Sequence, residues 1–393
     1  MATPFLILLL IIFFVAILLF AIVSIDLYLS LKMFYNRLYF GKWQSIEIWI
    51  NAVKKVNKTW LKKTPTVKLT DNDKYVVFDI LKGRYKSNTI QSWQEAGCLL
   101  GAIHTEESKK AIDLFIKQKI DLATSTWLQK PEYVDGAILA YAISKTNIAP
   151  QKLKPAFDDI ITLIESFKGN DGTVFYRNYT STIRFVDTIG FICPFLTFYA
   201  QTFNKPEYID LAFKQIEAYV DKAFLKQPFI PAHAYDIKKN LPLGIYGWGR
   251  GLGWFILGVV DMYIELDALH PKKETLKNMI IKTAESTLPL QKPDGGFNAM
   301  MGVDMSRHDS SITSLAGWLF YNAFIITKEV RFLNASKACL NCLMKVTRRS
   351  GAIDFCQGDT KGIGIYATTF DVMPFVQGLT IRLAESLKKN NND

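Results

Sequence analysis

The stretch Asn170-Asp171-Gly172-Thr173-Val174-Phe175 has two relatives further along the chain. Pro293-Asp294-Gly295-Gly296-Phe297 repeats it closely, and Ser350-Gly351-Ala352-Ile353-Asp354-Phe355 repeats it more loosely. Each copy predicts that a helix ends, that the chain turns at glycine, and that a short extended piece carries an aromatic residue into the next helix. A second pattern, Lys130-Pro131-Glu132-Tyr133-Val134-Asp135, returns at residues 205–210 as a helix start. Such repeats are typical of helical hairpins that pack against their neighbours.

From about residue 85 onward, stretches of helical periodicity alternate with short turns rich in Gly, Pro, Asn and Asp. Strand patterns are nearly absent from this part of the sequence. About 300 residues at roughly 50 residues per hairpin give close to six hairpins, which is enough to close a ring. We therefore predict an all-α fold, an (α/α)6 toroid, with an open α-solenoid as the alternative. The predicted helices cover residues 134–144, 154–167, 188–203, 208–223, 253–266, 273–287, 312–326, 330–346 and 369–386.

The composition is that of a folded protein, because 49% of the 393 residues are apolar. The formal net charge of +11 comes mostly from lysine rather than clustered arginine, and we expect no nucleic-acid partner. The five cysteines are an odd number spread along the chain, which is unlike a disulfide scaffold. Cys339 and Cys342 are predicted to be a buried thiol pair.

The N-terminal residues 1–25 contain no charged side chain and are long enough, at about 1.5 Å per residue, to cross a hydrocarbon layer of about 30 Å. A cleaved signal peptide would need a basic start, a shorter apolar stretch and a small-residue cleavage site, and the segment has none of them. A buried core helix is disfavoured because no polar stripe interrupts the apolar surface. We predict a single transmembrane anchor over residues 1–31, a basic juxtamembrane segment over residues 32–79 and the toroid over residues 80–390.

The side of the membrane on which the body lies stays open. No Lys or Arg precedes the span, whereas Lys32, Arg37 and Lys42 follow it, which favours the cytoplasmic face. A role on finished surface polysaccharide would require the exported face. The lysines between residues 54 and 63 either lie near anionic headgroups or form the solvated face of a helix.

The segment Tyr246-Gly247-Trp248-Gly249-Arg250-Gly251-Leu252-Gly253-Trp254 is the strongest candidate for ligand binding. The alternate glycines would let the backbone turn tightly and approach a ligand. Trp248 and Trp254 offer flat faces on which sugar rings stack, and Arg250 offers a planar fork for a carboxylate. Together they indicate a site for an acidic sugar. The alternative is a structural turn with tryptophans in the core.

Two aspartates are candidates for catalysis. Asp187 and Asp135 each precede an apolar helical stretch, and taken alone each would be a helix N-cap. In a helical toroid, however, helix N-termini line the mouth of the central cavity, where two carboxylates can share acid and base work. Burial beside aromatic residues would raise the pKa of one of them. The four histidines are far apart in sequence, and we expect no metal and no cofactor.

The order of these motifs resembles glycoside hydrolase families 105 and 88, the unsaturated rhamnogalacturonyl and glucuronyl hydrolases. The resemblance covers about residues 80 to 390 and is most specific in the tryptophan and glycine segment. It rests on Asp187-Thr188, Pro206-Glu207-Tyr208, His233-Ala234-Tyr235-Asp236, Trp248-Gly249-Arg250-Gly251-Leu252-Gly253-Trp254, Leu290-Gln291-Lys292-Pro293-Asp294-Gly295 and Cys356-Gln357-Gly358.

The resemblance implies an (α/α)6 barrel that removes a 4,5-unsaturated uronic acid from the non-reducing end of an acidic oligosaccharide or polysaccharide. In such enzymes an aspartate protonates C4 and helps water add at C5, and the resulting hemiketal falls apart. Carried onto this chain, Asp187 is the catalytic acid and base, and Asp135 is its carboxylate partner. The residues expected to line the sugar subsite are Phe185, His233, Trp248, Arg250 and Trp254.

The chain departs from the family pattern at three places. Phe185 stands where the family usually has Trp, Leu252 stands where it has Asn, and Asp309-Ser310-Ser311 replaces Glu-Thr-Ser. We therefore expect a more apolar subsite with fewer hydrogen bonds, and either a different substrate or an altered activity.

Two further functions compete with a membrane-anchored glycoside hydrolase that trims a surface polysaccharide. One is a non-catalytic carbohydrate-binding toroid in polysaccharide synthesis or export. The other is a basic scaffold at the membrane surface, which would depend on the lysines of residues 54–63. The sequence leaves the identity of the sugar and the oligomeric state open.

Overall fold

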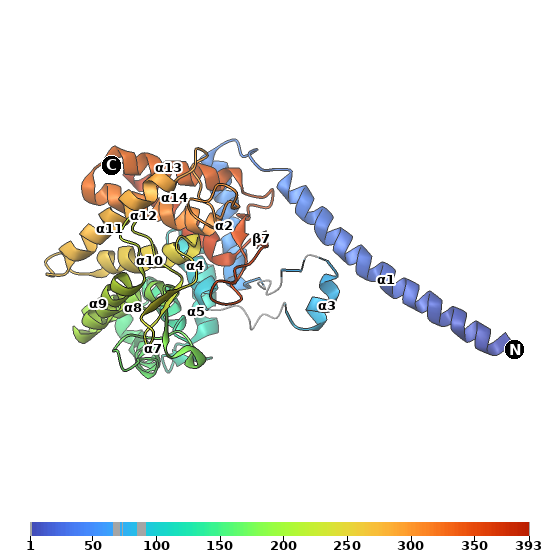
Figure 1. Cartoon of the computed structure of the whole chain (residues 1–393), viewed down its shortest axis with the longest axis horizontal. Helices are drawn as coiled ribbons and strands as arrows, with labels where there is room; N and C mark the ends of the chain where they lie inside the picture. Colours follow the sequence, from blue (N-terminus) through green and yellow to red (C-terminus); the bar gives the residue numbers. More distant parts are fainter. Residues whose placement is uncertain (1, 66–70, 73, 85–91, 393) are drawn as a thin grey trace.

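The computed structural model describes residues 2–65, 71–72, 74–84 and 92–392, and helices dominate them (Figure 1). Six helices form an inner ring in which each touches the next, and contact between the last and the first closes the ring. The inner helices are α4 (Ser92–Ala102), α6 (Gly136–Ser144), α8 (Asp187–Phe203), α10 (Gly249–Glu265), α12 (Ser310–Thr327) and α14 (Pro374–Asn392). This arrangement confirms the predicted all-α fold and the closed (α/α)6 toroid.

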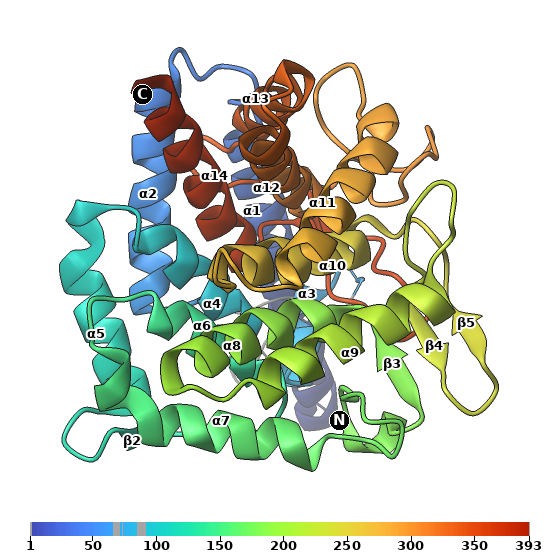
Figure 2. The same cartoon turned by 90° about the vertical axis from the view of Figure 1, so that its left-hand side faces the viewer.

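Six outer helices surround the ring, and Figure 2 shows them from the side away from the N-terminal helix. They are α2 (Ile46–Lys62), α5 (Lys109–Lys119), α7 (Lys154–Ser166), α9 (Glu207–Ala223), α11 (Lys273–Thr287) and α13 (Val330–Lys345). The inner helices are buried along most of their length because they are apolar on all sides, whereas the outer helices bury only one stripe. The single-turn helices are η2 (Glu106–Ser108), η3 (Pro150–Leu153), η4 (Asn178–Thr180) and η5 (Leu288–Leu290).

Short antiparallel strand pairs lie in the connections between helices. The strands are β1 (Ile120–Asp121), β2 (Thr126–Trp127), β3 (Ile183–Phe185), β4 (Ala234–Asp236), β5 (Leu241–Leu243), β6 (Cys356–Gln357) and β7 (Phe370–Asp371). They form the sheets β1-β2, β3-β4-β5 and β6-β7. The middle sheet joins the connection before α8 to the connection before α10, and it thereby brings two parts of the candidate site together.

Most predicted helices lie within a few residues of the observed ones, with three differences. Helices α4 and α5 were not predicted, and α14 begins at Pro374 rather than at residue 369 because Phe370 and Asp371 pair with Gln357 and Cys356 as a strand. Helix α2 packs against α14 and α4, so the stretch expected as a juxtamembrane segment contributes a helix to the toroid. The boundaries proposed at residues 31 and 79 stay predictions.

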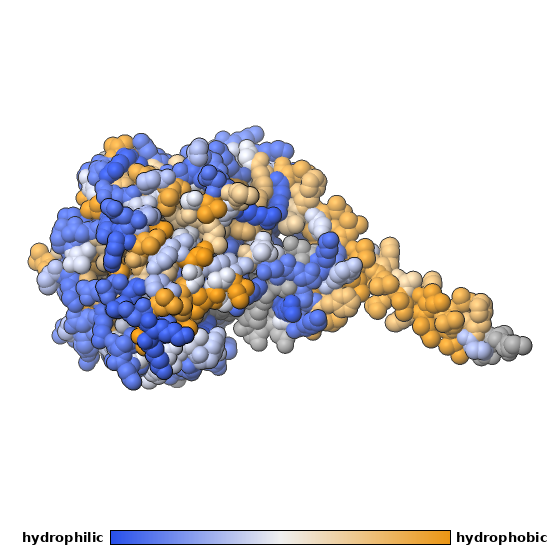
Figure 3. All heavy atoms as spheres, in the orientation of Figure 1, coloured by the Kyte–Doolittle hydropathy of each residue, from blue (hydrophilic) through white to orange (hydrophobic). Residues whose placement is uncertain are grey.

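The N-terminal helix α1 (Ala2–Arg37) projects away from the toroid, and its surface is apolar over most of its length (Figures 1 and 3). In the described part of the chain it is the one helix long and apolar enough to cross a membrane. Its last turn is fixed to the toroid, because Arg37 donates two hydrogen bonds, of 2.8 and 3.0 Å, to the buried carboxylate of Asp354. Helix α3 (Val76–Leu81) lies against α1, apart from the toroid.

Candidate active site

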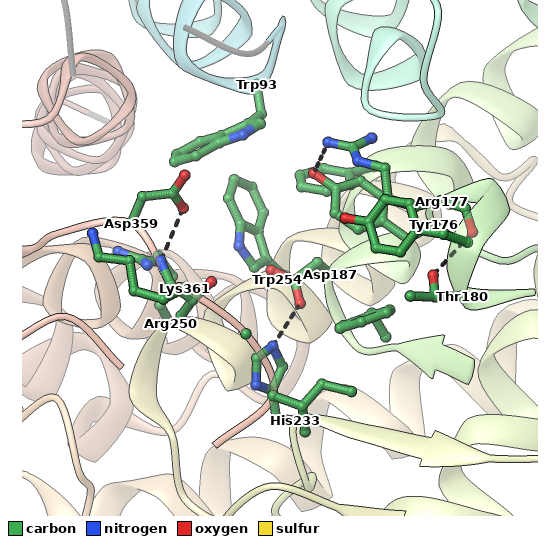
Figure 4. A pocket seen from close by; sticks show the side chains of 16 residues that line it. Trp93, Tyr176, Arg177, Thr180, Asp187, His233, Arg250, Trp254, Asp359 and Lys361 are labelled. Carbon is green, nitrogen blue, oxygen red and sulfur yellow. Dashed lines mark hydrogen bonds and ion pairs between the residues drawn. The ribbon is translucent and has the colours of Figure 1, made fainter. Parts of the chain in front are cut away.

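A cavity of about 410 Å³ opens at the end of the toroid where the inner helices begin (Figure 4). Its walls come from the N-terminal parts of α4, α8 and α10 and from three connecting segments. The lining residues are Trp93, Tyr176, Arg177, Tyr179, Thr180, Phe185, Asp187, Phe191, His233, Arg250, Trp254, Asp359, Thr360, Lys361, Gly362 and Ile363. Because helix N-termini carry partial positive charge, this end of the ring suits an anionic ligand.

Asp187 is the first residue of α8 and points into the cavity (Figure 4). The pairing of β3 with β4 and the hydrogen bond from Val186 N to His233 O, 3.1 Å long, place it beside His233. Its Oδ2 lies 3.8 Å from His233 Nε2 and has no hydrogen-bond partner among the described residues. Val186, not Asp187, is the N-cap residue of α8, so the N-cap interpretation of Asp187 is wrong. An unpartnered carboxyl oxygen is therefore available to a ligand.

The protonation of this pair follows from its burial. Burial raises the pKa of Asp187 to about 7, although Arg250 acts in the opposite direction, and the negative charge of Asp359 raises the pKa further. Burial, together with the charge of Arg250, lowers the pKa of His233 to about 3. His233 is therefore neutral near pH 7, where Asp187 exchanges a proton readily. A carboxyl group with this pKa is suited to general acid catalysis.

Arg250 is held in a fixed position in the first turn of α10. Its guanidinium donates hydrogen bonds to the carbonyl oxygens of Gln357, at 2.5 Å, and Gly358, at 2.9 Å. These two bonds leave other N–H groups of the guanidinium available to a ligand, and the side chain lines the cavity. Arg250 thus supplies a fixed positive charge near Asp187, as the acidic-sugar hypothesis requires.

The two tryptophans of the segment differ in their positions. Trp254 lines the cavity and packs against Trp93 and Phe191, with ring centroids 5.5 and 4.8 Å away. Trp248 does not line the cavity; it is 1% exposed, donates a hydrogen bond to Gln357 Oε1 at 3.0 Å, and packs on His233. Its predicted role in stacking on the sugar stays a prediction, and its contacts support the orientation of His233.

The alternate glycines serve packing rather than a turn at the ligand. Positions 249, 251 and 253 are helical, and a Cβ on Gly253 would come within 2.6 Å of Leu315 on α12. The turn itself uses Gly247, whose φ is +83°. The glycines inside α10 therefore shape no tight turn, and the expectation of a turn holds only at Gly247.

Asp135 lies behind the cavity wall. It precedes α6, is 3% exposed, accepts a hydrogen bond of 3.1 Å from Ser92 N and lies 3.6 Å from Arg177 Nη1. Burial raises its pKa to about 6, while Arg177 acts in the opposite direction. Its side chain does not cap the helix. Asp135 positions Arg177, which lines the cavity, and its part in catalysis stays a prediction.

Several lining residues escaped the sequence analysis. Trp93 comes from α4, a helix that was not predicted, and Tyr176 and Arg177 directly follow the repeated turn at residues 170–175. Asp359 and Lys361 follow the Cys356-Gln357-Gly358 motif, which was the available signal for them. The cavity therefore contains a second carboxylate and two further cationic side chains besides Arg250.

The three departures from the family pattern have different consequences. Phe185 lines the cavity, and the more apolar subsite expected there stays a prediction. Leu252 is fully buried and does not line the cavity, so its expected effect on the sugar is wrong. Asp309 is buried too, and it accepts hydrogen bonds from Ser311 N and Gln357 N at 2.8 and 3.3 Å. It acts on the segment that holds Arg250.

The described residues contain no cluster of three or more His, Cys, Asp or Glu side chains that could hold a metal ion. Cys339 and Cys342 are both buried and unbonded, as predicted for a buried thiol pair. The cavity presents carboxyl groups, neutral His233 and cationic side chains.

Comparison with known proteins gives a consistent result. The model of Glycosyl Hydrolase Family 88 matches residues 52–333. An unsaturated 3S-rhamnoglycuronyl hydrolase from an Alteromonas species is 29% identical over 101 residues, which are 25% of this chain and 24% of that protein. The chain thus matches about a quarter of the length of this curated relative.

Solved structures share the fold at low sequence identity. A possible member of glycoside hydrolase family 105 from Salmonella enterica has a TM-score of 0.71 at 15% identity, covering 87% of this chain and 94% of its own. An unsaturated glucuronyl hydrolase from a Bacillus species, described as responsible for the degradation of glycosaminoglycan, has a TM-score of 0.62 at 15% identity, covering 89% and 97%. These likenesses show the toroidal fold.

Proposed function

The chain belongs to glycosyl hydrolase family 88, and from that premise we propose that it hydrolyses acidic oligosaccharides or polysaccharides that end in a 4,5-unsaturated uronic acid. The observation that carries this proposal is Asp187: a buried carboxyl with a pKa of about 7 and an unpartnered Oδ2, in a cavity that also presents cationic side chains. Such a site supplies both a proton and the means to hold a carboxylate.

The proposed reaction is a hydration. Protonated Asp187 transfers its proton to C4 of the C4=C5 double bond, and a water molecule adds at C5 and returns a proton to the Asp187 carboxylate. The product is a hemiketal at C5, whose ring opens, and the sugar at C1 is then released. One water is consumed, and Asp187 ends as it began. Neutral His233 lies beside this carboxyl, with its Nε2 3.8 Å from Asp187 Oδ2.

The substrate carboxylate is expected to lie among the cationic side chains of the cavity. Arg250 is fixed by two backbone carbonyls, and Arg177 is held beside Asp135 and over the rings of Tyr133 and Tyr176, 3.9 and 3.8 Å from its guanidinium carbon. Phe185 and Trp254 supply apolar surface for the ring. The Alteromonas relative acts, by its name, on an unsaturated rhamnoglycuronyl substrate, which supports an unsaturated uronyl sugar here.

We further propose that α1 anchors the enzyme in a membrane. Residues 4–25 are uncharged, and their apolar side chains are exposed: Phe13, Phe14 and Phe20 are 64%, 67% and 75% exposed. Exposing so much apolar surface to water is unfavourable, whereas a bilayer accepts it. Sodium carbonate extraction of cell membranes tests this: the full chain should stay with the membrane, and recovery in the soluble fraction would contradict the proposal.

The experiment for the activity uses the full chain in detergent and unsaturated uronyl disaccharides produced by polysaccharide lyases. The ultraviolet absorbance of the C4=C5 bond should disappear with the wild-type protein and persist with Asp187→Asn. The matched control is Asp221→Asn, because the Asp221 side chain is 69% exposed and remote from the cavity lining. If the wild type binds these sugars without consuming the double bond, the proposed hydration is wrong and a binding role replaces it.

A further inference from the structure

Helix α3 is attached to α1 at the end of the uncharged stretch. Asp26, the first charged residue of the chain, accepts hydrogen bonds from the backbone N–H groups of Tyr75 and Val76, at 2.5 and 3.1 Å. One turn earlier on α1, Ile22 is only 5% exposed, although α1 is otherwise largely exposed, and α1 and α3 are in contact. The position of α3 along α1 is therefore fixed at residues 22–26.

The outer face of α3 is apolar and unusually exposed for so short a helix. Tyr75, Phe78, Ile80 and Leu81 are 55%, 47%, 50% and 77% exposed. Helix α3 contacts α1, on which Tyr28 is 63% exposed. Two exposed lysines, Lys74 and Lys82, flank the helix. Aromatic residues with neighbouring lysines are typical of segments at the boundary between hydrocarbon and anionic headgroups.

The level of α3 relative to a bilayer follows from helix geometry. The 22 residues from 4 to 25 span about 33 Å, which covers a hydrocarbon layer of about 30 Å. If α1 spans the membrane as proposed above, Asp26 lies at the edge of the hydrocarbon, and the apolar face of α3 lies at the same level. A lipid surface is the occupant that the continuity with α1 and the flanking lysines favour.

The same geometry directs the cavity toward that surface. The loop that supplies Asp359 to Ile363 to the cavity continues to Thr368 and Thr369, which donate hydrogen bonds of 3.2 and 3.1 Å to Asp71, shortly before α3. The loop ends in β7, where Arg37 of α1 donates to Phe370 O at 3.1 Å. Figure 1 shows β7 on the side of the toroid that faces α1 and α3. The mouth of the cavity is therefore on the side of the toroid that faces α1 and α3.

We propose that α3 docks on the bilayer and, together with α1, holds the mouth of the cavity toward the membrane, so that the site takes the ends of acidic glycans attached to that membrane. This inference rests on the proposed activity and span. Residues 26 to 37 of α1 add about 16 Å of helix between the bilayer edge and the toroid, a gap that admits a short stretch of glycan. Substrate thus reaches the cavity from the lipid surface.

The docking is tested without any activity measurement. The full-length Leu81→Cys variant is labelled with an environment-sensitive fluorophore and inserted into vesicles of phosphatidylethanolamine and phosphatidylglycerol. Labelling is selective because the native cysteines are buried. The control is Leu269→Cys. Leu269 is 92% exposed and follows the C-terminal end of α10, whereas the cavity lies at the N-terminal end of that helix. We expect a blue-shifted emission and quenching by doxyl-labelled lipid for residue 81 only.

Two outcomes of this measurement overturn the docking. Water-like emission from residue 81 in vesicles would show that lipid does not cover α3. A blue shift that appears only at high protein-to-lipid ratio would show that a second copy of the chain covers it.

The consequence for substrate is tested with one disaccharide in two forms, free or coupled through its reducing end to phosphatidylethanolamine in the same vesicles. The double substitution Phe78→Asp and Leu81→Asp should slow hydrolysis of the coupled form at least fivefold and change that of the free form by less than twofold. Leu269→Asp should change neither. Equal rates on the coupled form would refute the membrane-directed site. If the wild type hydrolyses neither form, the proposed activity fails, and the fluorescence still decides the docking.

Discussion

Asp187 has the pKa of a group that is partly protonated near neutral pH, and this pKa determines how kcat is expected to depend on pH. Because burial raises its pKa to about 7 and the proton donor must be protonated, we expect kcat to fall about tenfold per unit as the pH rises above 7. His233, with a pKa lowered to about 3, does not titrate in this range. The measurement is kcat against pH from 5 to 9. A rate that rises through pH 7 would contradict the role of Asp187 as the acid.

The same raised pKa destabilises the folded protein at alkaline pH. An unfolded Asp has a pKa of about 3.9, so the folded state binds the proton more tightly, and stability present at low pH is lost as the pH rises from about 4 through 7. Asp187→Asn removes the buried charge and should stabilise the protein at pH 8 by on the order of 4 kcal/mol, given a rise of about three pKa units at about 1.4 kcal/mol per unit. Thermal unfolding of the wild type and of Asp187→Asn at pH 4 and pH 8 measures this change in stability. No gain at pH 8, relative to Asp221→Asn, would show that the carboxylate is solvated.

Sequence reasoning identified the candidate residues that stand in motifs and missed those that the fold assembles. Asp187, His233, Arg250 and Trp254 line the cavity, as the resemblance implied. Trp93 could not be found in this way, because it comes from α4, more than 150 residues from Trp254 in the chain, and the two meet only when the ring closes. The alternate glycines were misinterpreted for a related reason: a sequence does not show which helix will pack against a Cβ position.

At the scale of elements, the last turn of α1 is tied to the segment that holds Arg250. The Asp354 carboxylate is fully buried and accepts hydrogen bonds from Arg37 and from Arg348, at 2.6 Å. Three residues later, the carbonyl of Gln357 accepts from Arg250. Helix α1 and a cavity residue are therefore linked through one short stretch of backbone.

Arg37→Ala should therefore destabilise the protein and weaken substrate binding. Removing one partner leaves the buried Asp354 charge with less compensation, which costs about 1 to 3 kcal/mol. The matched control is Arg331→Ala, whose ion pairs with Glu329 and Glu285 are exposed and should contribute about 0.5 kcal/mol or less. Urea unfolding and KM report the two effects. Equal losses of stability and of substrate affinity in the two variants would refute the link between Arg37 and the segment that holds Arg250.

Helix types and approximate bounds were predictable because period and turn residues are local signals. The strands and helix α4 were not predictable from such local signals. Phe370 and Asp371 were assigned to a helix, yet they pair with residues near 356 because the loop between them folds back. Helix α4 contains two glycines, Gly97 and Gly101, which disfavour a helix on propensity alone, and it forms because α14 packs against them. Tertiary contact overrides local preference at both places.

At the scale of the whole molecule, the toroid closes where α4 meets α14, which lie nearly 300 residues apart in the chain. The closure depends on backbone contact, because a Cβ on Gly378 would lie 1.8 Å from the carbonyl oxygen of Gly97 and 2.8 Å from Cys98 Cα. No side-chain movement relieves contact with backbone atoms, so the two helices would have to separate.

Gly378→Ala should therefore open the seam and lower stability by about 3 kcal/mol or more, at the upper end of the range for overpacked cores. Because Trp93 of α4 lines the cavity beside Trp254, substrate binding should weaken as well. Gly362→Ala is the control for the unfolding measurement alone, because Gly362 lines the cavity; its Cβ would meet only Ile365, at 3.8 Å, and its φ is not positive. Chemical unfolding and disaccharide affinity measure both effects. If the two variants are equally stable, closure does not depend on this contact, and the cavity wall formed by α4 is held by the outer helices α2 and α5 instead.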